Sequence, residues 1–121
     1  MSFAPGILEG KTAVVTGGAT GIGSYIARML ASLGAKVGIV SRKEENLKAA
    51  VEAFKNDDGL EVLWRVGDVR VPDLIKEVVE ELAGEMGGLD ILVCNAAGNF
   101  ICPTEELSAN GWRTVIDIDL N

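Results

Sequence analysis

Histidine is absent from the sequence, and cysteine occurs only twice, as Cys94 and Cys102. Without histidine the chain has no imidazole ligands, and the spacing of the two cysteines is not that of a metal-ligand pair. We therefore expect no zinc or other metal site. Two cysteines are also too few for a disulfide framework, so a reducing, cytoplasmic compartment is the default expectation. No apolar run approaches the ~20 residues of a membrane-spanning helix. The first residues also lack the basic and apolar segments of a signal peptide.

Basic side chains are in the minority. Eleven Lys and Arg against 18 Asp and Glu give a formal net charge of −7. Nucleic acids and anionic membranes bind to basic faces, so we expect neither as a partner. A small anionic ligand needs only a local positive site and stays compatible with this charge.

Apolar residues, by contrast, make up 48% of the 121 residues, which is enough for the core of one domain. Apolar periodicity predicts strands at 12–16, 36–40, 61–66 and 89–93 and helices at 21–33, 44–55 and 72–86. A turn is expected at 56–59, a loop at 94–107, and a last helix from Ser108 carrying Trp112, Val115, Ile116 and Leu120.

This alternation of strands and helices predicts an α/β fold, a Rossmann-type doubly wound parallel sheet with strand order 3-2-1-4. Such sheets usually continue beyond their switch point. We therefore expect residues 1–121 to be the N-terminal cofactor-binding part of a single domain that is incomplete here.

The strongest functional signal is the glycine-rich segment 16–23, which joins the first strand to the first helix. Glycines let the backbone approach a pyrophosphate, and the helix N-terminus offers it free N–H groups. The alternative is a merely tight turn, but the strand before and the helix after favour a dinucleotide site. The residues expected to contact the cofactor here are Thr16, Gly17, Thr20, Gly21, Ile22 and Gly23.

Ser41 and Arg42 follow the second strand, where dinucleotide folds that bind NAD place an acid against the ribose. Neither residue is acidic, and the planar guanidinium of Arg42 suits a 2′-phosphate. The pattern therefore favours NADP(H). The alternative is a solvated basic start to the helix that continues with Glu44.

Three further segments carry weaker signals. Asp68 and Val69 follow the third strand, where a carboxylate can accept a hydrogen bond from an adenine amino group. Small residues after the fourth strand would keep the floor of a cofactor cleft open: Asn95, Ala96, Ala97 and Gly98. Asn95 can also bond backbone on both sides. On the expected last helix, Asp117 and Asn121 share a face and Asp119 points elsewhere, although such acidic helix faces are usually just solvated.

Together these residues resemble the short-chain dehydrogenase/reductase family, over essentially the whole chain. The resemblance is carried by the Thr-Gly-x-x-x-Gly-Ile-Gly turn at 16–23, the Asp68-Val69 pair and the Asn-Ala-Ala-Gly element at 95–98. The loop 95–103 and the segment 114–119 look like those of 2,4-dienoyl-CoA reductases, particularly the peroxisomal type. That resemblance implies NADPH-dependent reduction of a 2,4-dienoyl-CoA to an enoyl-CoA, an acyl-CoA partner, and a homodimer or homotetramer. A peroxisomal location is the alternative to a cytoplasmic one for a eukaryotic source.

The same resemblance assigns the substrate end of the site to two positions that mix subtypes. Asp119 stands where the wider family has an asparagine and the peroxisomal type an acid. Asn121 matches an asparagine of the mitochondrial type, and the two cannot be ranked from the sequence. The catalytic tyrosine and lysine of the family are expected beyond residue 121, because Tyr25 lies on the first helix, so the chain alone is expected to be inactive. The alternatives are a 3-oxoacyl-ACP or 3-oxoacyl-CoA reductase of the same family and a non-catalytic nucleotide-binding module.

Overall fold

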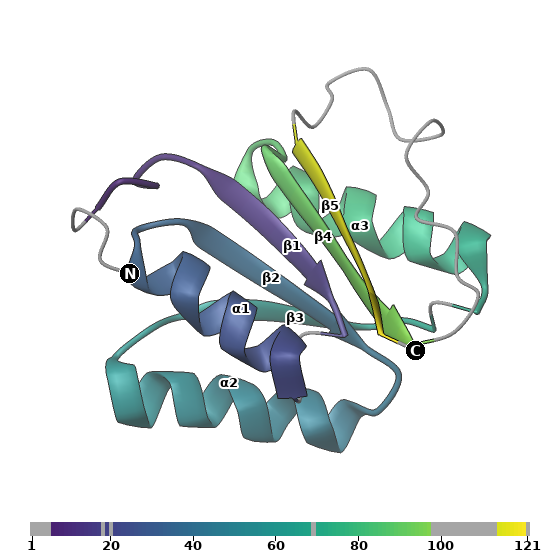
Figure 1. Cartoon of the computed structure of the whole chain (residues 1–121), viewed down its shortest axis with the longest axis horizontal. Helices are drawn as coiled ribbons and strands as arrows, with labels where there is room; N and C mark the ends of the chain where they lie inside the picture. The colour runs from purple at the N-terminus through teal and green to yellow at the C-terminus, as the bar shows by residue number, and fades with distance from the viewer. Residues whose placement is uncertain (1–5, 18, 20, 69, 98–113, 121) are drawn as a thin grey trace.

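The computed structural model describes residues 6–17, 19, 21–68, 70–97 and 114–120. Strands and helices alternate along most of this length (Figure 1). The strands are β1 (Thr12–Thr16), β2 (Lys36–Ser41), β3 (Val62–Val66), β4 (Ile91–Ala97) and β5 (Thr114–Leu120). The helices are α1 (Gly21–Ser32), α2 (Glu44–Asp58) and α3 (Pro72–Met86).

The strands form one parallel sheet in the order β3-β2-β1-β4-β5. Val14 of β1 lies at the centre of the sheet, aligned with Gly38 of β2 and Leu92 of β4. The predicted order 3-2-1-4 is therefore confirmed, with one further strand added beside β4. No helix within the described ranges is both long and apolar enough to cross a membrane.

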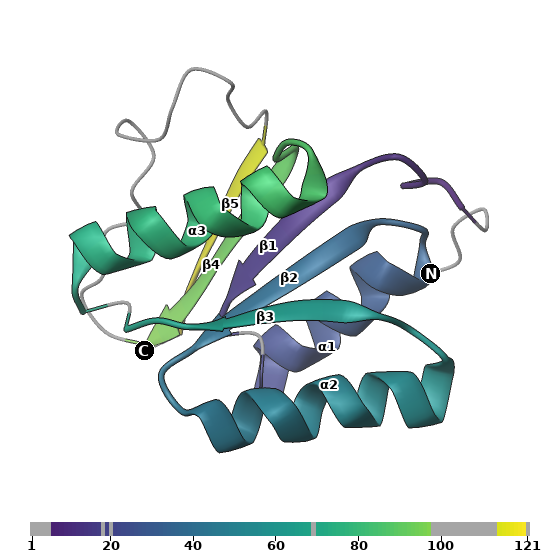
Figure 2. The same cartoon turned by 180° about the vertical axis from the view of Figure 1, so that it is seen from behind.

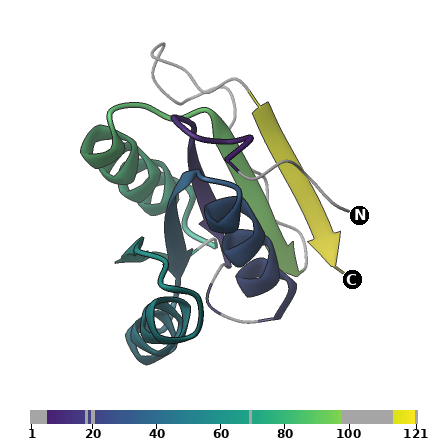
Figure 3. The same cartoon turned by 90° about the vertical axis from the view of Figure 1, so that its left-hand side faces the viewer.

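The helices cover both faces of the sheet. α1 and α2 lie on one face and α3 on the other, as the opposite views and the end view show (Figures 2 and 3). Alternate residues of β1 pack against the helices on opposite faces of the sheet, because successive side chains of a strand point to opposite faces. Val15 packs with Leu47 and Phe54 on the α1–α2 side, whereas Val14 packs with Leu82 on the α3 side. This two-sided burial explains why the central strand β1 is apolar at three consecutive residues and buried along its whole length.

The expected last helix is wrong over its described part. Residues 114–120 form β5, which pairs in parallel with β4 from Thr114 opposite Ile91 to Leu120 opposite Ala97. The segment alternates β-branched or apolar residues with acids at Asp117 and Asp119, a pattern of period two that suits a strand. Pairing also satisfies backbone groups along the edge of β4 that would otherwise lack partners within the sheet. Ser108 and Trp112 lie outside the described residues.

Three smaller expectations are also corrected. β4 extends to Ala97, so Asn95 lies on a strand and not in a loop, and α2 continues to Asp58 through most of the expected turn. In α1 the buried face is made by small residues and one leucine: Gly23, Ala27, Leu30 and Ala31. The apolar spacing of 21–33 places Ile22 and Met29 on one helix face with Leu30, but in the structure they are 49% and 37% exposed. Close approach of α1 to the sheet requires small side chains. The helix therefore turns its small residues toward the sheet, and some of its largest apolar residues are left partly exposed.

Candidate functional site: the carboxyl edge of the sheet

The carboxyl ends of the parallel strands meet along one edge of the sheet, where ligands of open α/β folds bind. The glycine turn follows β1 at this edge, Arg42 follows β2, and Asp68 follows β3. Asn95 lies near the end of β4, and the arrowheads of β4 and β5 point to the same edge (Figure 1). The topology therefore brings together residues from four separate parts of the chain.

Gly17 begins the turn with a backbone conformation that favours glycine, at φ 69°. Its N–H donates a 2.7 Å hydrogen bond to the carbonyl oxygen of Val40, which ties the turn to β2. A Cβ atom at this position would overlap the carbonyl oxygen of Asn95. The close contact between the turn and β4 therefore excludes any side chain at position 17.

Gly23 makes a second close approach, one turn into α1. A Cβ atom here would overlap the carbonyl group of Gly17 and lie 2.5 Å from Nδ2 of Asn95. Gly21, the first residue of α1, has a positive φ of 59° but open space where its Cβ would be. The first turn of α1 contains no acidic residue. The helix thus presents its N–H groups, with their partial positive charge, at an open and uncrowded side of the turn.

Asn95 connects the turn to β4. It is 9% exposed, and its Nδ2 donates a 3.3 Å hydrogen bond to the carbonyl oxygen of Gly17, 78 positions earlier in the sequence. Its Oδ1 is buried without a hydrogen-bond partner in the described part of the structure. The expectation that Asn95 bonds backbone on both sides is met on one side only. A buried carbonyl of this kind can accept a hydrogen bond from a ligand.

Arg42 lies exposed just beyond Ser41, the last residue of β2. The carbonyl oxygen of Ser41 accepts a 2.9 Å hydrogen bond from the N–H of Gly67, so the ends of β2 and β3 are held together. None of the ion pairs between described residues involves Arg42. Its guanidinium is therefore available to an anion at this edge.

Asp68 follows β3 and is held by Arg70. Nη2 of Arg70 donates to Oδ2 at 2.8 Å, Nε donates to Oδ1 at 3.0 Å, and the backbone N–H of Arg70 donates to Oδ1 at 2.9 Å. These hydrogen bonds, and to a lesser degree the positive charges of Arg70 and Arg42, lower the pKa of Asp68 from its usual 3.8 to about 2, against the opposing effect of desolvation. The carboxylate is therefore ionised throughout the neutral range.

The structure places most of the predicted site residues on this edge. Thr16 is buried, and its Oγ1 donates to the carbonyl oxygen of Val93 at 3.4 Å. Ala96 and Ala97 belong to the last part of β4, and Asp119 is aligned with Ala96 in β5. Four predicted residues lie outside the described ones: Thr20, Val69, Gly98 and Asn121.

The sequence patterns did not predict Arg70 as a residue of the site. An aspartate two residues before an arginine, directly after a strand, is a detectable signal, because an aspartate side chain often bonds backbone two residues on. The signal is weak, since acid–base pairs at this spacing are common on protein surfaces. Only the folded loop shows that side chain and backbone of Arg70 converge on one carboxylate.

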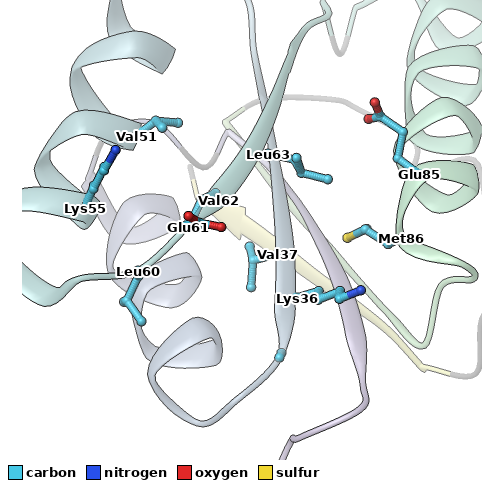
Figure 4. Close-up of a pocket in the computed structure, with 11 residues that line it drawn as sticks. Lys36, Val37, Val51, Lys55, Leu60, Glu61, Val62, Leu63, Glu85 and Met86 are labelled. Carbon is cyan, nitrogen blue, oxygen red and sulfur yellow. The ribbon is translucent and has the colours of Figure 1, made fainter.

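A separate cavity of about 590 Å³ opens at the other end of the strands. Side chains of α2 and α3 approach it across the starts of β2 and β3 (Figure 4). Lys36 and Val62, the first residues of their strands, line it together with Lys55, Glu61 and Glu85. It lies at the amino edge and shares no residue with the glycine turn. Among the described residues there is also no cluster of acids or cysteines that could hold a metal.

Comparison with known proteins agrees with this geometry. Residues 11–121 match the family profile of the short chain dehydrogenases. A peroxisomal 2,4-dienoyl-CoA reductase of Arabidopsis thaliana is 42% identical over 117 residues, which are 97% of this chain and 39% of that protein. A probable 2,4-dienoyl-CoA reductase of Bacillus subtilis is 38% identical over 94% of this chain and 44% of that protein. The chain thus spans about two fifths of the length of these curated relatives.

Solved structures agree on the fold. A citronellol catabolism dehydrogenase of Pseudomonas aeruginosa superimposes with a TM-score of 0.72 at 36% identity, over 86% of this chain and 43% of that one. A 2-keto-3-deoxy-D-gluconate dehydrogenase of Streptococcus agalactiae gives 0.70 at 37% identity, over 87% and 39%. The resemblance inferred from the glycine turn, the Asp-Val pair and the Asn-Ala-Ala-Gly element is confirmed. With its sheet order, its glycine turn and these relatives, the chain belongs to the short chain dehydrogenase family.

Proposed function

We propose that this chain is the cofactor-binding part of an NADPH-dependent reductase that acts on a 2,4-dienoyl-CoA. The observation that supports the cofactor most directly is the pair of close approaches at Gly17 and Gly23, beside the open N-terminus of α1. A pyrophosphate needs backbone N–H donors at a surface without side chains, and this turn offers both. When bound, NADPH supplies the hydride for the reduction.

The preference for NADPH rests on Arg42. Its exposed guanidinium follows β2, no acid stands at Ser41 or Arg42, and the described ion pairs leave Arg42 free to meet a 2′-phosphate. A guanidinium can bind a phosphate through two parallel hydrogen bonds. An acid at this position would instead favour the ribose 2′-hydroxyl of NADH.

The substrate proposal rests on the relatives, several of which are named 2,4-dienoyl-CoA reductases. We place the acyl-CoA beside the ends of β4 and β5, and we assign Asp119 and Asn121 to substrate contact. The alignment of Asp119 with Ala96 puts it at the same edge as Asn95 and supports this assignment. We further propose that the complete protein forms a homodimer or homotetramer and obtains its catalytic tyrosine and lysine from residues beyond this chain.

The cellular compartment that we propose depends on the kind of organism from which the protein comes. Relatives named as peroxisomal occur in Danio rerio and Rattus norvegicus, and another relative occurs in Bacillus subtilis. We therefore propose a peroxisomal location for a eukaryotic source and a cytoplasmic one for a bacterial source.

The test is oxidation of NADPH and NADH by the full gene product, followed by the absorbance of the reduced nicotinamide. We expect turnover with a 2,4-dienoyl-CoA, little with a 3-oxoacyl-CoA, and a higher kcat/KM for NADPH. Arg42→Asp should reverse the cofactor preference, since a phosphate-binding cation becomes a repulsive anion. Lys36→Asp makes the same change of charge at the amino edge and should leave the preference as it was.

Two results would overturn parts of this proposal. If the unaltered protein had equal kcat/KM for NADPH and NADH, Arg42 would not be the residue that binds the 2′-phosphate. If the protein turned over a 3-oxoacyl-CoA but not a dienoyl-CoA, the 3-oxoacyl-CoA would take the place of the dienoyl-CoA as the proposed substrate.

A further inference from the structure

We propose that Arg70 is a positioning residue for cofactor recognition: it orients the carboxylate of Asp68 and leaves it one open acceptor position, which selects adenine through its amino group. The inference rests on the proposed dinucleotide site and goes beyond it, because it assigns a role to a residue that does not itself touch the base. It starts from the number of hydrogen bonds that converge on one carboxylate.

An ionised carboxylate has about four acceptor positions, two on each oxygen. Oδ1 of Asp68 accepts from the backbone N–H of Arg70 and from its Nε, at 2.9 and 3.0 Å. Oδ2 accepts from Nη2 at 2.8 Å and shares the Nε hydrogen at 3.2 Å. Three N–H groups therefore serve about four acceptor positions, because the Nε hydrogen is shared between the two oxygens. One position, on Oδ2, is left for a further donor.

The pair combines rigidity with access. The side chain of Asp68 is 20% exposed and that of Arg70 is 58% exposed, so both side chains of the pair are accessible from solvent. A carboxylate bonded to both a backbone N–H and a planar guanidinium has little freedom to rotate. The carbonyl oxygen of Asp68 also accepts a 2.9 Å hydrogen bond from Val71, which closes the loop before α3.

Charge supports the same role. Two guanidinium nitrogens of Arg70, Nε and Nη2, already donate to Asp68. The hydrogen bonds from Arg70 keep the Asp68 carboxylate ionised, with a lowered pKa, and therefore an acceptor only. An acceptor with one open direction favours a base that presents an N–H₂ group and disfavours one that presents a carbonyl. Adenine presents an amino group at C6, where hypoxanthine presents a carbonyl, and the neighbouring N1 is an acceptor in adenine but a donor in hypoxanthine.

The experiment compares NADPH with its hypoxanthine analogue, in which a carbonyl replaces the adenine amino group. Dissociation constants for both are measured by fluorescence titration of the full gene product and of three variants: Arg70→Gln, Arg70→Lys and Asp68→Asn. The readout is the ratio of the two dissociation constants, which a general loss of folding would not change selectively. Arg65→Gln, at an arginine of β3 paired with Glu81 and Glu85, is the matched control.

We expect the unaltered protein and Arg65→Gln to prefer adenine by roughly ten- to a hundredfold, the range for a hydrogen bond to a charged group. Arg70→Gln should reduce this ratio to about threefold or less, with Arg70→Lys in between, because lysine restores the charge but not the planar fork. Asp68→Asn should abolish the preference, and adding Arg70→Gln to it should change the ratio no further.

Other results would overturn the inference. If Arg70→Gln keeps the full ratio, or lowers the ratio equally with and without Asp68→Asn, Arg70 does not act through Asp68. If Arg70→Gln weakens NADPH far more than NADH, the arginine binds the 2′-phosphate instead. A protein that binds neither cofactor contradicts the proposed function itself, an outcome separate from all of these.

Discussion

The two edges of the sheet use the same strands for opposite purposes. At the amino edge, Thr12 and Asp90 satisfy each other: Thr12 N–H donates to Oδ2 of Asp90 at 3.0 Å, and Asp90 N–H donates to Oγ1 of Thr12 at 3.1 Å. The Thr12 hydroxyl also donates to the carbonyl oxygen of Gly88 at 2.8 Å. The amino ends of β1 and β4 are thereby closed by hydrogen bonds within the protein.

The carboxyl edge leaves groups open. Oδ1 of Asn95 is buried without a partner in the described structure, and a Cβ at Gly21 would meet no described atom within 4 Å beyond its chain neighbours. Arg42 is exposed and takes part in none of the described ion pairs. A buried acceptor without a partner, such as Oδ1 of Asn95, costs stability in the free protein, and such groups are retained where a ligand completes them. From this comparison we expect the hydrogen-bonded amino ends of β1 and β4 to contribute stability and the carboxyl edge to contribute binding, and single substitutions can separate the two.

The largest effect is expected from Gly23→Ala. The added methyl group would overlap the backbone of Gly17, and backbone cannot move aside as a side chain can. We expect a loss of about 2–3 kcal/mol or more in the free energy of unfolding, together with loss of cofactor binding. Urea unfolding and cofactor titration measure the two effects.

Gly84→Ala provides the matched control in α3, where a Cβ would meet nothing within 4 Å. Alanine is a better helix former than glycine, so this variant should gain about 0.5–1 kcal/mol and bind the cofactor unchanged. A stable, cofactor-binding Gly23→Ala protein would contradict the close approach of α1 to the turn.

A middle-sized effect is expected from Thr12→Val, which removes a hydroxyl that both donates and accepts at the closed edge. We expect a loss of about 1–2 kcal/mol in stability and no change in cofactor affinity. The same substitution at Thr16 removes only one long hydrogen bond of 3.4 Å, so it should cost less stability but weaken cofactor binding. If Thr12→Val weakened binding as much as Thr16→Val did, the division of labour between the edges would be wrong.

The smallest effect concerns the titration of Asp68. Its pKa is lowered to about 2, so the carboxylate favours the folded state above its usual value of 3.8, and this contribution is lost as the pH falls toward 2. Between pH 5 and pH 8 the carboxylate is ionised in both the folded and the unfolded protein, so we expect almost no change in stability over that range. Arg70→Gln should return the pKa most of the way toward 3.8, as carboxyl NMR titration would show. An unchanged pKa would mean that Arg70 does not hold the carboxylate in solution.

Local patterns in the sequence predicted most of the fold. Buried parallel strands are continuously apolar, so 12–16 and 36–40 were located from composition alone. The spacing of Gly17, Gly21 and Gly23 located the turn. The predicted secondary structure was wrong where two local patterns compete. The segment 114–120 suits both a helix and a strand, and pairing with β4 favours the strand.

The sequence by itself determined the class of fold, the glycine turn and the absence of an acid after β2, because each depends on neighbouring residues. Tertiary structure alone decided that Asn95 crowds Gly17 and Gly23, since those contacts join residues more than 70 positions apart. It also decided that Arg70 closes on Asp68, which requires a loop geometry that two residues in sequence do not specify. Local propensity selects the elements, and packing between distant elements selects which of their groups are satisfied and which stay open to a ligand.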